Sequence, residues 1–366
     1  MIEWERNPAM TIIWLTLLMV FIFSYTARYF AASLPHSPIS IRPNRLLVAA
    51  VCFVIVMVAG LRKNIGDTFF YMHAYALKNF TWATIATEKD VGFNLFQMLL
   101  KQISEDPQIL IFVTALITNV LIVLVMHRYA RLFELAMYVY ITSGAFIVSM
   151  NGIRQYMAAA LLFAATAYLL NGSWKRYMVV VALASVFHMS ALILIPLYFI
   201  VRREAWTGMT FGLLAAGVLI VGLFNQFSDL LFSALSETQY GEYKEFKEGG
   251  ANIIRVGLYM MPLLVAYWGR DKLRMLFADI DIIVNLSLIG SFFMLISTQN
   301  WIFARLAIYF NLYQIVLTSW IVMAFRKKDQ KLIYLCILVI YGIYFTYENM
   351  FVLGIMYRSD FLIWFH

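Results

Sequence analysis

Residues 151–203 read NGIRQYMAAALLFAATAYLLNGSWKRYMVVVALASVFHMSALILIPLYFIVRR, and this stretch decides how the chain is arranged. It places Arg154 at the start of one apolar run and His188 inside the next. A central arginine costs roughly 2.5 to 3.5 kcal/mol at membrane depth on insertion scales, so a functional role is the first hypothesis for such groups. The rest of the chain is interpreted as the scaffold that places these two side chains.

The composition of the 366 residues excludes a soluble globular protein, because 63% are hydrophobic and only 13% are charged. The net charge of +8 comes from short clusters of Lys and Arg between apolar runs. Such clusters are typical of membrane topology signals. The basic residues do not form the continuous basic face that would indicate nucleic-acid binding. Cys52 and Cys336 both lie in apolar runs, which indicates neither a disulfide framework nor a metal cluster. We therefore expect no metal and no cofactor.

The apolar runs have the length of membrane spans. They fall at about 9–30, 45–61, 109–126, 133–150, 154–170, 177–200, 207–224, 254–268, 280–298, 304–325 and 332–347. They predict an all-α polytopic membrane protein with about 11 or 12 membrane segments in a single polytopic domain over residues 1–366. No internal repeat is present, so an inverted-repeat transporter gains no support.

The orientation follows from basic clusters after alternate runs. These clusters are Arg28 with Arg42 and Arg45, Arg128 with Arg131, and Lys175 with Arg176. They predict an N-terminus outside and a cytoplasmic location for every second loop. If the run 177–200 crossed once, all later basic clusters would fall outside, against this rule. These later basic residues are Arg202, Arg203, Arg270, Lys272, Arg274, Arg326, Lys327, Lys328 and Lys331.

We therefore predict a broken or re-entrant pair at 177–200, with arms 177–187 and 189–200 and a reversal near His188. At 1.5 Å per residue each arm is only about 16 to 18 Å long, too short for a full span. No Gly or Pro marks the turn, so a single tilted span is the alternative.

This topology places the long loops 62–108 and 225–253 outside. Within the first loop, residues 88–106 have apolar side chains at helical spacing. They predict an amphipathic helix, which either lies on the outer interface or packs against the bundle. The segment 225–253 has the composition of a solvated loop.

Four arginines lie near the outer ends of apolar runs in this topology: Arg62, Arg154, Arg255 and Arg305. Together they predict an anion site, because a guanidinium offers forked donors that suit phosphate oxygens. For each of them, interfacial snorkelling is the alternative.

Two further groups near this end have two interpretations each. His188 is either an interior histidine bonded to the backbone or a general base that takes a proton from a sugar hydroxyl. Asp67 lies between Arg62 and Tyr71, and it either pairs with Arg62 or orients sugar hydroxyls. No nucleotide-binding signature is present, so an enzyme of this kind would take its donor from the membrane, with a phosphate head group and a lipid tail.

Three motifs resemble those of EpsG-type exopolysaccharide proteins. RKNIGDTFFY is similar to the pattern R-x-x-x-G-x-D-x-x-x-Y, except that Asp67 follows Gly66 directly. KDVGFNLF is similar to an acidic-x-Gly-aromatic element through Asp90, Gly92 and Phe93. The helix R-Q-x-x-A and the element F-H-x-S-A-x-x-x-x-P are matched by Arg154, Gln155, Phe187, His188, Ser190, Ala191 and Pro196. These motifs cover roughly the first 200 residues, while the C-terminal half matches only in hydropathy.

The resemblance implies a Wzy-like polymerase of exopolysaccharide in the bacterial plasma membrane, for biofilm matrix or capsule, with a bundle similar to GT-C glycosyltransferases. It implies a metal-independent transfer of repeat units carried on undecaprenyl diphosphate at the outer face. We expect His188 to deprotonate the acceptor and Arg154 and Arg305 to bind the diphosphate, with Arg62, Arg255 and Gln155 assisting and Asp67 and Tyr71 contacting sugar. Membrane lipids and other exopolysaccharide synthesis proteins are the other expected partners. A lipid-linked glycan transporter and a non-catalytic assembly component are the alternatives.

Overall fold

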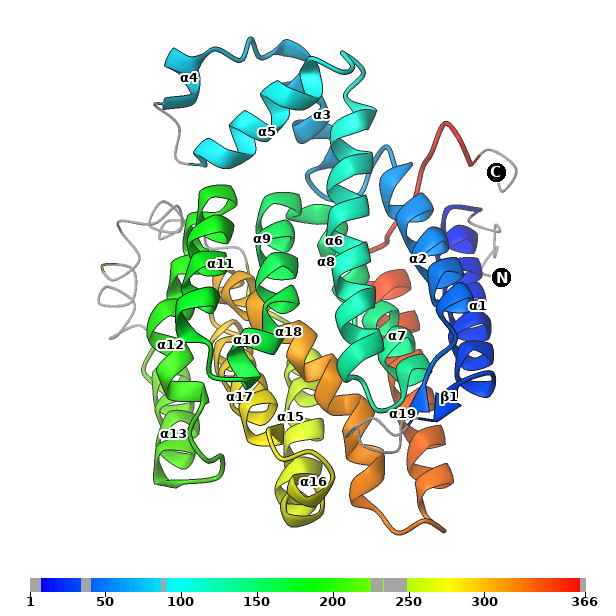
Figure 1. Cartoon of the computed structure of the whole chain (residues 1–366), viewed down its shortest axis with the longest axis vertical. Coiled ribbons are helices and arrows are strands. Elements are labelled where there is room, and N and C mark those ends of the chain that lie inside the picture. The colour runs from blue at the N-terminus through cyan, green and yellow to red at the C-terminus, as the bar shows by residue number, and fades with distance from the viewer. Residues whose placement is uncertain (1–7, 34–40, 87–89, 225–232, 234–248, 363–366) are drawn as a thin grey trace. The chain divides into compact units, whose positions relative to one another are not determined.

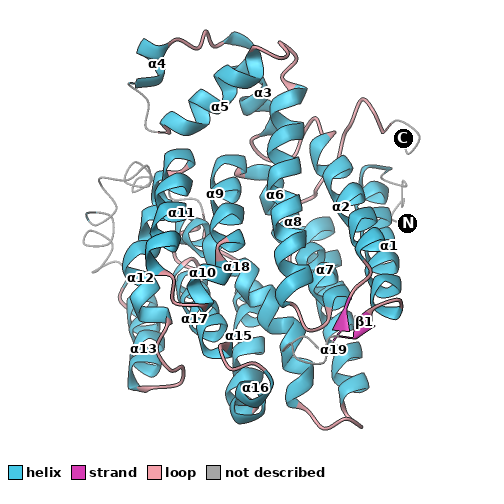
Figure 2. Cartoon of the chain, viewed as in Figure 1, coloured by secondary structure: helices cyan, strands magenta, loops and turns pink. Residues whose placement is uncertain are grey.

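The computed structural model describes residues 8–33, 41–86, 90–224, 233 and 249–362. This part of the chain is nearly all helix, as Figure 2 shows. Its strands are the two-residue pair β1 (Ala32–Ser33) and β2 (Ile41–Arg42), which are antiparallel. The prediction of an all-α polytopic membrane protein is therefore confirmed. Most of the expected loop 225–253 lies outside the described residues.

Four described helices are long and apolar enough to cross a membrane: α1 (Pro8–Tyr29), α6 (Gln108–Tyr129), α18 (Ile302–Ile321) and α19 (Gln330–Thr346). Six shorter apolar segments are α2 (Arg45–Gly60), α9 (Ile153–Ala164), the 3-10 turn Met189–Ile193 with α12 (Leu194–Val201), α13 (Gly208–Gly222), α15 (Ile253–Trp268) and α17 (Ile280–Ile296).

One expected straight span is bent. The run 133–150 forms α7 (Phe133–Thr142) and α8 (Ala145–Asn151), which meet at 56°. Gly144 lies between them with φ +84°, a left-handed conformation that glycine adopts without steric cost. The bend therefore has a local cause in the sequence.

By its internal contacts the chain divides into two compact units. The first unit comprises Met1–Ala164, Val186–His188 and Lys331–His366, and the second comprises Ala165–Ser185 and Met189–Gln330. The first also contains α3 (Thr68–Leu77), α4 (Trp82–Ala86) and α5 (Val91–Lys101), and the second contains α10 (Thr166–Leu170), most of α11 (Trp174–Phe187) and α16 (Arg270–Leu276) (Figure 1). The expectation of a single domain stays a prediction.

The first unit has two chemically different ends. Its basic end carries Arg28, Arg42, Arg45, Arg128 and Arg131. Three contacts join these segments: Arg28 pairs with Glu134, the Asn44 amide donates to the Ala27 carbonyl, and a His127 ring nitrogen lies 3.1 Å from the Pro43 carbonyl oxygen. The opposite end is the motif end, which comprises the end of α2, helices α3 to α5 and the start of α9 (Figure 1).

The segment 88–106 was expected to form an amphipathic helix that either packs against the bundle or lies on the membrane interface, and helix α5 has features of both. Phe93 and Leu100 are buried in the first unit, so one face packs against the bundle. Val91 and Leu99 of α5 are 41% and 51% exposed, and Ile103 just after the helix is 75% exposed, so apolar side chains of this segment are also uncovered. An uncovered apolar face on a membrane protein is suited to lipid.

The predicted reversal at His188 is confirmed by contacts within the second unit. The rings of Tyr177 and Tyr198 lie with their centroids 5.2 Å apart. A continuous helix would separate these residues by roughly 30 Å, at 1.5 Å per residue. Helix α11 ends at Phe187 and a 3-10 turn begins at Met189, so this tighter helix turns the chain without Gly or Pro.

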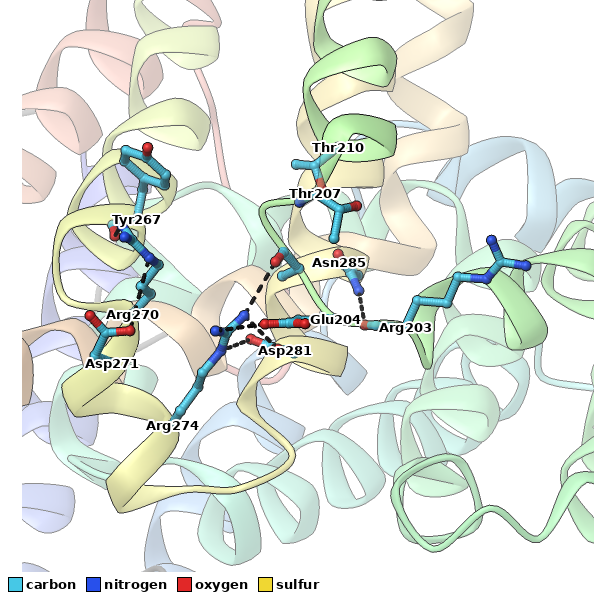
Figure 3. Close-up of polar contacts among 11 residues, drawn as sticks. Arg203, Glu204, Thr207, Thr210, Tyr267, Arg270, Asp271, Arg274, Asp281 and Asn285 are labelled. Atoms are coloured by element: carbon cyan, nitrogen blue, oxygen red, sulfur yellow. Dashed lines mark hydrogen bonds and ion pairs between the residues drawn. The ribbon is translucent and has the colours of Figure 1, made fainter.

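The second unit also gathers basic residues at one end, as the reversal requires. Arg274 lies between Glu204 and Asp281, with nitrogen to oxygen distances of 2.9 Å to both carboxylates (Figure 3). The hydrogen bond to Asp281 raises the pKa of Arg274. Lys272 donates to the Phe325 carbonyl at 2.5 Å, which brings the end of α18 to the same place. Lys272 and Arg274 therefore lie close to the chain that leads into Arg326, Lys327 and Lys328, whereas Arg255 and Arg305 lie in the first turns of α15 and α18.

Candidate functional site

Two of the three motifs meet at the motif end of the first unit. The Asn151 side chain accepts a hydrogen bond from the Asp67 amide at 2.9 Å. Gly66 has φ +51°, and a Cβ at this position would overlap the Asn151 side chain. Glycine therefore allows the loop before α3 to approach the start of α9, where Arg154 lies.

A second glycine brings the KDVGFNLF motif against the residues before His188. A Cβ on Gly92 would lie 2.5 Å from the Val186 side chain and 3.0 Å from its carbonyl oxygen. The rings of Phe96 and Phe187 also touch, with centroids 6.3 Å apart. Helix α5 therefore packs on the end of α11, directly before His188.

An ion pair lies at the centre of this arrangement. Arg154 Nη1 donates to Asp90 Oδ2 at 2.6 Å, and the guanidinium carbon lies 5.8 Å from the ring centre of Tyr71 and 5.9 Å from that of Phe93. The Asp90 side chain is 2% exposed, whereas that of Arg154 is 38% exposed. A buried carboxylate thus holds a guanidinium that still reaches the surface, which is a geometry suited to binding an anion.

Hydrogen bonds around the backbone of Asp90 fix its position at the start of α5. Its backbone carbonyl accepts from the Asn94 amide side chain at 3.2 Å, and Lys78 donates to Asn94 at 3.2 Å. A carboxylate before the first turn of a helix is favoured by the helix dipole. The sequence indicated Asp90 only as part of a motif and missed its pairing with Arg154.

His188 and Arg154 border one hydrophobic cluster of the first unit. Their neighbours in sequence, Phe187 and Ile153, both belong to it. The cluster further includes Tyr71, Tyr75, Phe93, Phe96, Leu100, Leu110, Ile111 and Met157. His188 itself is 4% exposed. The two residues on which the sequence interpretation rests therefore lie in the same packed region.

Arg62 does not pair with Asp67. Its Nε donates to Thr68 at 2.9 Å, and its terminal nitrogens donate to the carbonyls of Met150, at 2.7 Å, and Ala59. Arg62 is 1% exposed, and burial lowers its pKa to about 9, which leaves it charged at neutral pH. These contacts fasten the end of α2 to the end of α8, so Arg62 positions the site.

The four remaining residues that the sequence predicted for the site are divided between the two units. Asp67 is half-buried in the first unit, and no ion pair within the described residues includes it. Gln155 is buried beside Arg154. Arg255 and Arg305 belong to the second unit, where Val256 and Ala304 join one cluster and bring the first turns of α15 and α18 together. Arg305 there lies 4.9 Å from the ring centre of Trp301.

The second unit contains an apolar cavity of about 220 Å³ near its basic end. Leu197, Ile200, Leu288 and Phe292 are among the residues that line it. Thr207, Thr210, Asn285 and the backbone of Arg203 form its polar side, and Asn285 donates to the Arg203 carbonyl at 2.7 Å (Figure 3). Among the described residues, no group of three or more His, Cys, Asp or Glu side chains could hold a metal ion.

Comparison with known proteins agrees with the motifs. No curated protein and no solved structure matches the chain. The model of the EpsG family matches residues 45–359, which cover most of the chain and include the ion pair, the reversal, most of the first unit and all of the second. This family is associated with exopolysaccharide polymerases. A match of this extent shows that the chain belongs to the EpsG family.

Proposed function

We propose that this protein polymerises exopolysaccharide by joining oligosaccharide repeat units carried on undecaprenyl diphosphate. The observation that carries the proposal is the meeting of three motifs around the ion pair of Arg154 with Asp90. The pair holds a half-exposed guanidinium beside Tyr71, in the same packed region as His188. A guanidinium with a fixed orientation suits the oxygens of a diphosphate.

In the proposed reaction, a sugar hydroxyl of the acceptor attacks the anomeric carbon of the donor unit. The new glycosidic bond forms as the bond from that carbon to the diphosphate oxygen breaks. The diphosphate leaves with the bonding electrons, and Arg154 stabilises its developing charge. His188 takes the proton of the attacking hydroxyl. No nucleotide sugar and no metal enters this scheme.

The other residues have supporting roles in the proposal. Asp90 fixes the guanidinium of Arg154, and Arg62 fixes the loop that carries Asp67. Asp67 and Tyr71 contact sugar hydroxyls, and Gln155 supports the start of α9. Arg255 and Arg305 belong to the second unit, and their expected role in binding the diphosphate stays a prediction from the sequence.

We place this chemistry at the outer face of the bacterial plasma membrane. Five arginines occupy the basic end of the first unit, opposite the motif end. These arginines flank short connections between apolar helices, and basic residues in such connections are retained on the cytoplasmic side of membrane proteins. This supports an outward location of the opposite, motif end. Polymer made there would supply a biofilm matrix or capsule.

The test is reconstitution of the full chain in liposomes with an undecaprenyl-diphosphate repeat unit, without nucleotide sugar or divalent metal. We expect glycans of more than one repeat unit, resolved on a gel. His188→Ala should lower the rate by roughly 100-fold to 10,000-fold, the usual contribution of a general base. If the unchanged chain made no polymer under these conditions, the protein would be an assembly component instead. If His188→Ala and Arg154→Ala variants inserted normally and still made polymer, the roles assigned to these two residues would be wrong.

A further inference from the structure

A groove between α2 and α6 lies at the basic end of the first unit, away from the motif end. It has a volume of about 600 Å³, within the range of roughly 300 to 1,000 Å³ that is usual for ligand sites. Arg42, Arg45 and Arg128 line it together with His127. Its other walls are Val48, Ala49, Cys52, Val120 and Leu124. Charge and apolar surface therefore meet in one groove.

The three arginines come from three different elements that are fixed to one another. Arg42 lies in β2, Arg45 is the first residue of α2, and Arg128 lies in the last turn of α6. The Asn44 amide donates to the Ala27 carbonyl of α1 at 2.8 Å. A His127 ring nitrogen lies 3.1 Å from the Pro43 carbonyl oxygen. These contacts hold the segment with Arg42 against α6.

Carboxylates do not neutralise this group of arginines. All three side chains are exposed, and no ion pair within the described residues includes them. The described lining of the groove contains no Asp or Glu. Topology requires positive charge at a cytoplasmic end, but it does not require three guanidiniums around one groove. A ligand with negative charge and an apolar chain would complement both parts.

We propose that this groove binds an anionic glycerophospholipid. Its phosphate lies among Arg42, Arg45 and Arg128, and one acyl chain follows the wall of Val120 and Leu124. Basic pockets between transmembrane helices on the cytoplasmic side are suited to anionic lipid head groups. The first turn of α2 adds the positive end of a helix dipole beside Arg45, although the Asn44 side chain already accepts from the amides of Leu46 and Leu47. This site is independent of the proposed polymerase reaction.

The experiment measures thermal unfolding of the purified full chain in neutral detergent while lipid is titrated. Phosphatidylglycerol should raise the melting temperature in a saturable manner, and phosphatidylcholine should not, because a ligand that binds the folded state stabilises it. Arg42→Gln, Arg45→Gln and Arg128→Gln combined should weaken the apparent affinity for phosphatidylglycerol on the order of a hundredfold, from about fivefold per arginine.

The matched control combines Arg326→Gln, Lys327→Gln and Lys328→Gln, which remove the same charge from exposed positions of the second unit. It should bind phosphatidylglycerol like the unchanged protein. Replacing the three groove arginines with Lys should retain most of the affinity because the positive charge stays. If the triple Gln variant fails to fold, Arg42→Gln, Arg45→Gln and Arg128→Gln are measured singly, and each should weaken the affinity about fivefold.

Three outcomes would overturn the proposal: equal stabilisation by phosphatidylcholine, unchanged affinity in the groove variant, or the same shift with inorganic phosphate alone. None of these measurements uses polymer as the readout. A failure here therefore leaves the proposed polymerase function untouched.

Discussion

Arg154 in the first unit and Arg274 in the second are both held by carboxylates, but their surroundings differ. The partner of Arg154 is Asp90, whose side chain is 2% exposed. The partners of Arg274 are Glu204 and Asp281, at 68% and 18% exposure. Exposed ion pairs contribute about 0 to 1 kcal/mol, whereas breaking a buried pair leaves an uncompensated charge. We infer that Arg274 fastens segments together, whereas Arg154 is held ready for a ligand.

The largest expected difference between the two arginines is in polymer synthesis. Arg154→Gln should reduce the rate on the order of a hundred to a thousandfold, as expected when a donor to a developing charge is removed. Arg274→Gln should stay within about twofold of the unchanged protein, because the exposed part of its ion-pair network contributes little. The measurement is the initial rate of glycan elongation in liposomes at matched protein insertion. Equal loss in both variants would remove the distinction.

Asp90→Asn tests whether Arg154 depends on its buried carboxylate partner. The change keeps the shape of the side chain and an oxygen that can accept from Arg154, but it removes the carboxylate charge, and hydrogen bonds to charged groups are worth about 1.5 to 3 kcal/mol. We expect a loss in polymer synthesis of roughly tenfold to a hundredfold, by conversion of that free energy. Asp281→Asn is the matched control and should leave the rate unchanged. A rate as high as that of the unchanged protein in Asp90→Asn would mean that Arg154 does not depend on this pair.

The contact between α5 and the turn at His188 can be tested with glycine. Gly92→Ala places a methyl group 2.5 Å from the Val186 side chain, and overpacking of this kind costs about 1 to 3 kcal/mol. We expect a lower melting temperature and less polymer. Adding Val186→Ala should restore stability because it removes the side-chain overlap. The restoration should be only partial, because the contact with the Val186 carbonyl oxygen at 3.0 Å stays.

Gly257→Ala is the control for Gly92→Ala. Gly257 lies inside α15, and a Cβ at this position would meet no atom within 4 Å. Alanine should therefore leave stability unchanged or raise it by up to about 1 kcal/mol through helix propensity. If Gly257→Ala and Gly92→Ala had the same effect on the melting temperature, the close approach of Gly92 to Val186 would not contribute to stability.

The sequence predicted the helical polytopic class and the reversal, because both depend on local hydropathy and on where positive charge is retained. Of the 11 or 12 expected segments, four described helices, or five with the bent pair, are long and apolar enough to cross a membrane. The start of α15 at Ile253 and of α17 at Ile280 fall within a residue of the expected runs. The bend at Gly144 was missed, although glycine inside a long apolar run was its signal.

The site was predictable only in part. Hydropathy cannot pair side chains that are far apart, and Asp90 lies 64 residues from Arg154. Nearness in sequence suggested a pair of Arg62 with Asp67, but the guanidinium instead meets the carbonyl of Met150, 88 residues away. Such pairings are decided by how α2, α5 and α9 pack, which no local pattern records.

The smallest expected effects lie within the Arg274 network itself. Asp281 accepts two hydrogen-bonding contacts from Arg274, at 2.9 and 3.1 Å, and is mostly buried. Glu204 has one at 2.9 Å and is largely exposed. Asp281→Asn should therefore lower the free energy of unfolding by about 1 kcal/mol, and Glu204→Gln by a few tenths at most. Thermal unfolding at low and high salt measures both, and the smaller effect should vanish in salt because exposed pairs are screened. A larger loss for Glu204→Gln would show that exposure does not rank these two contacts.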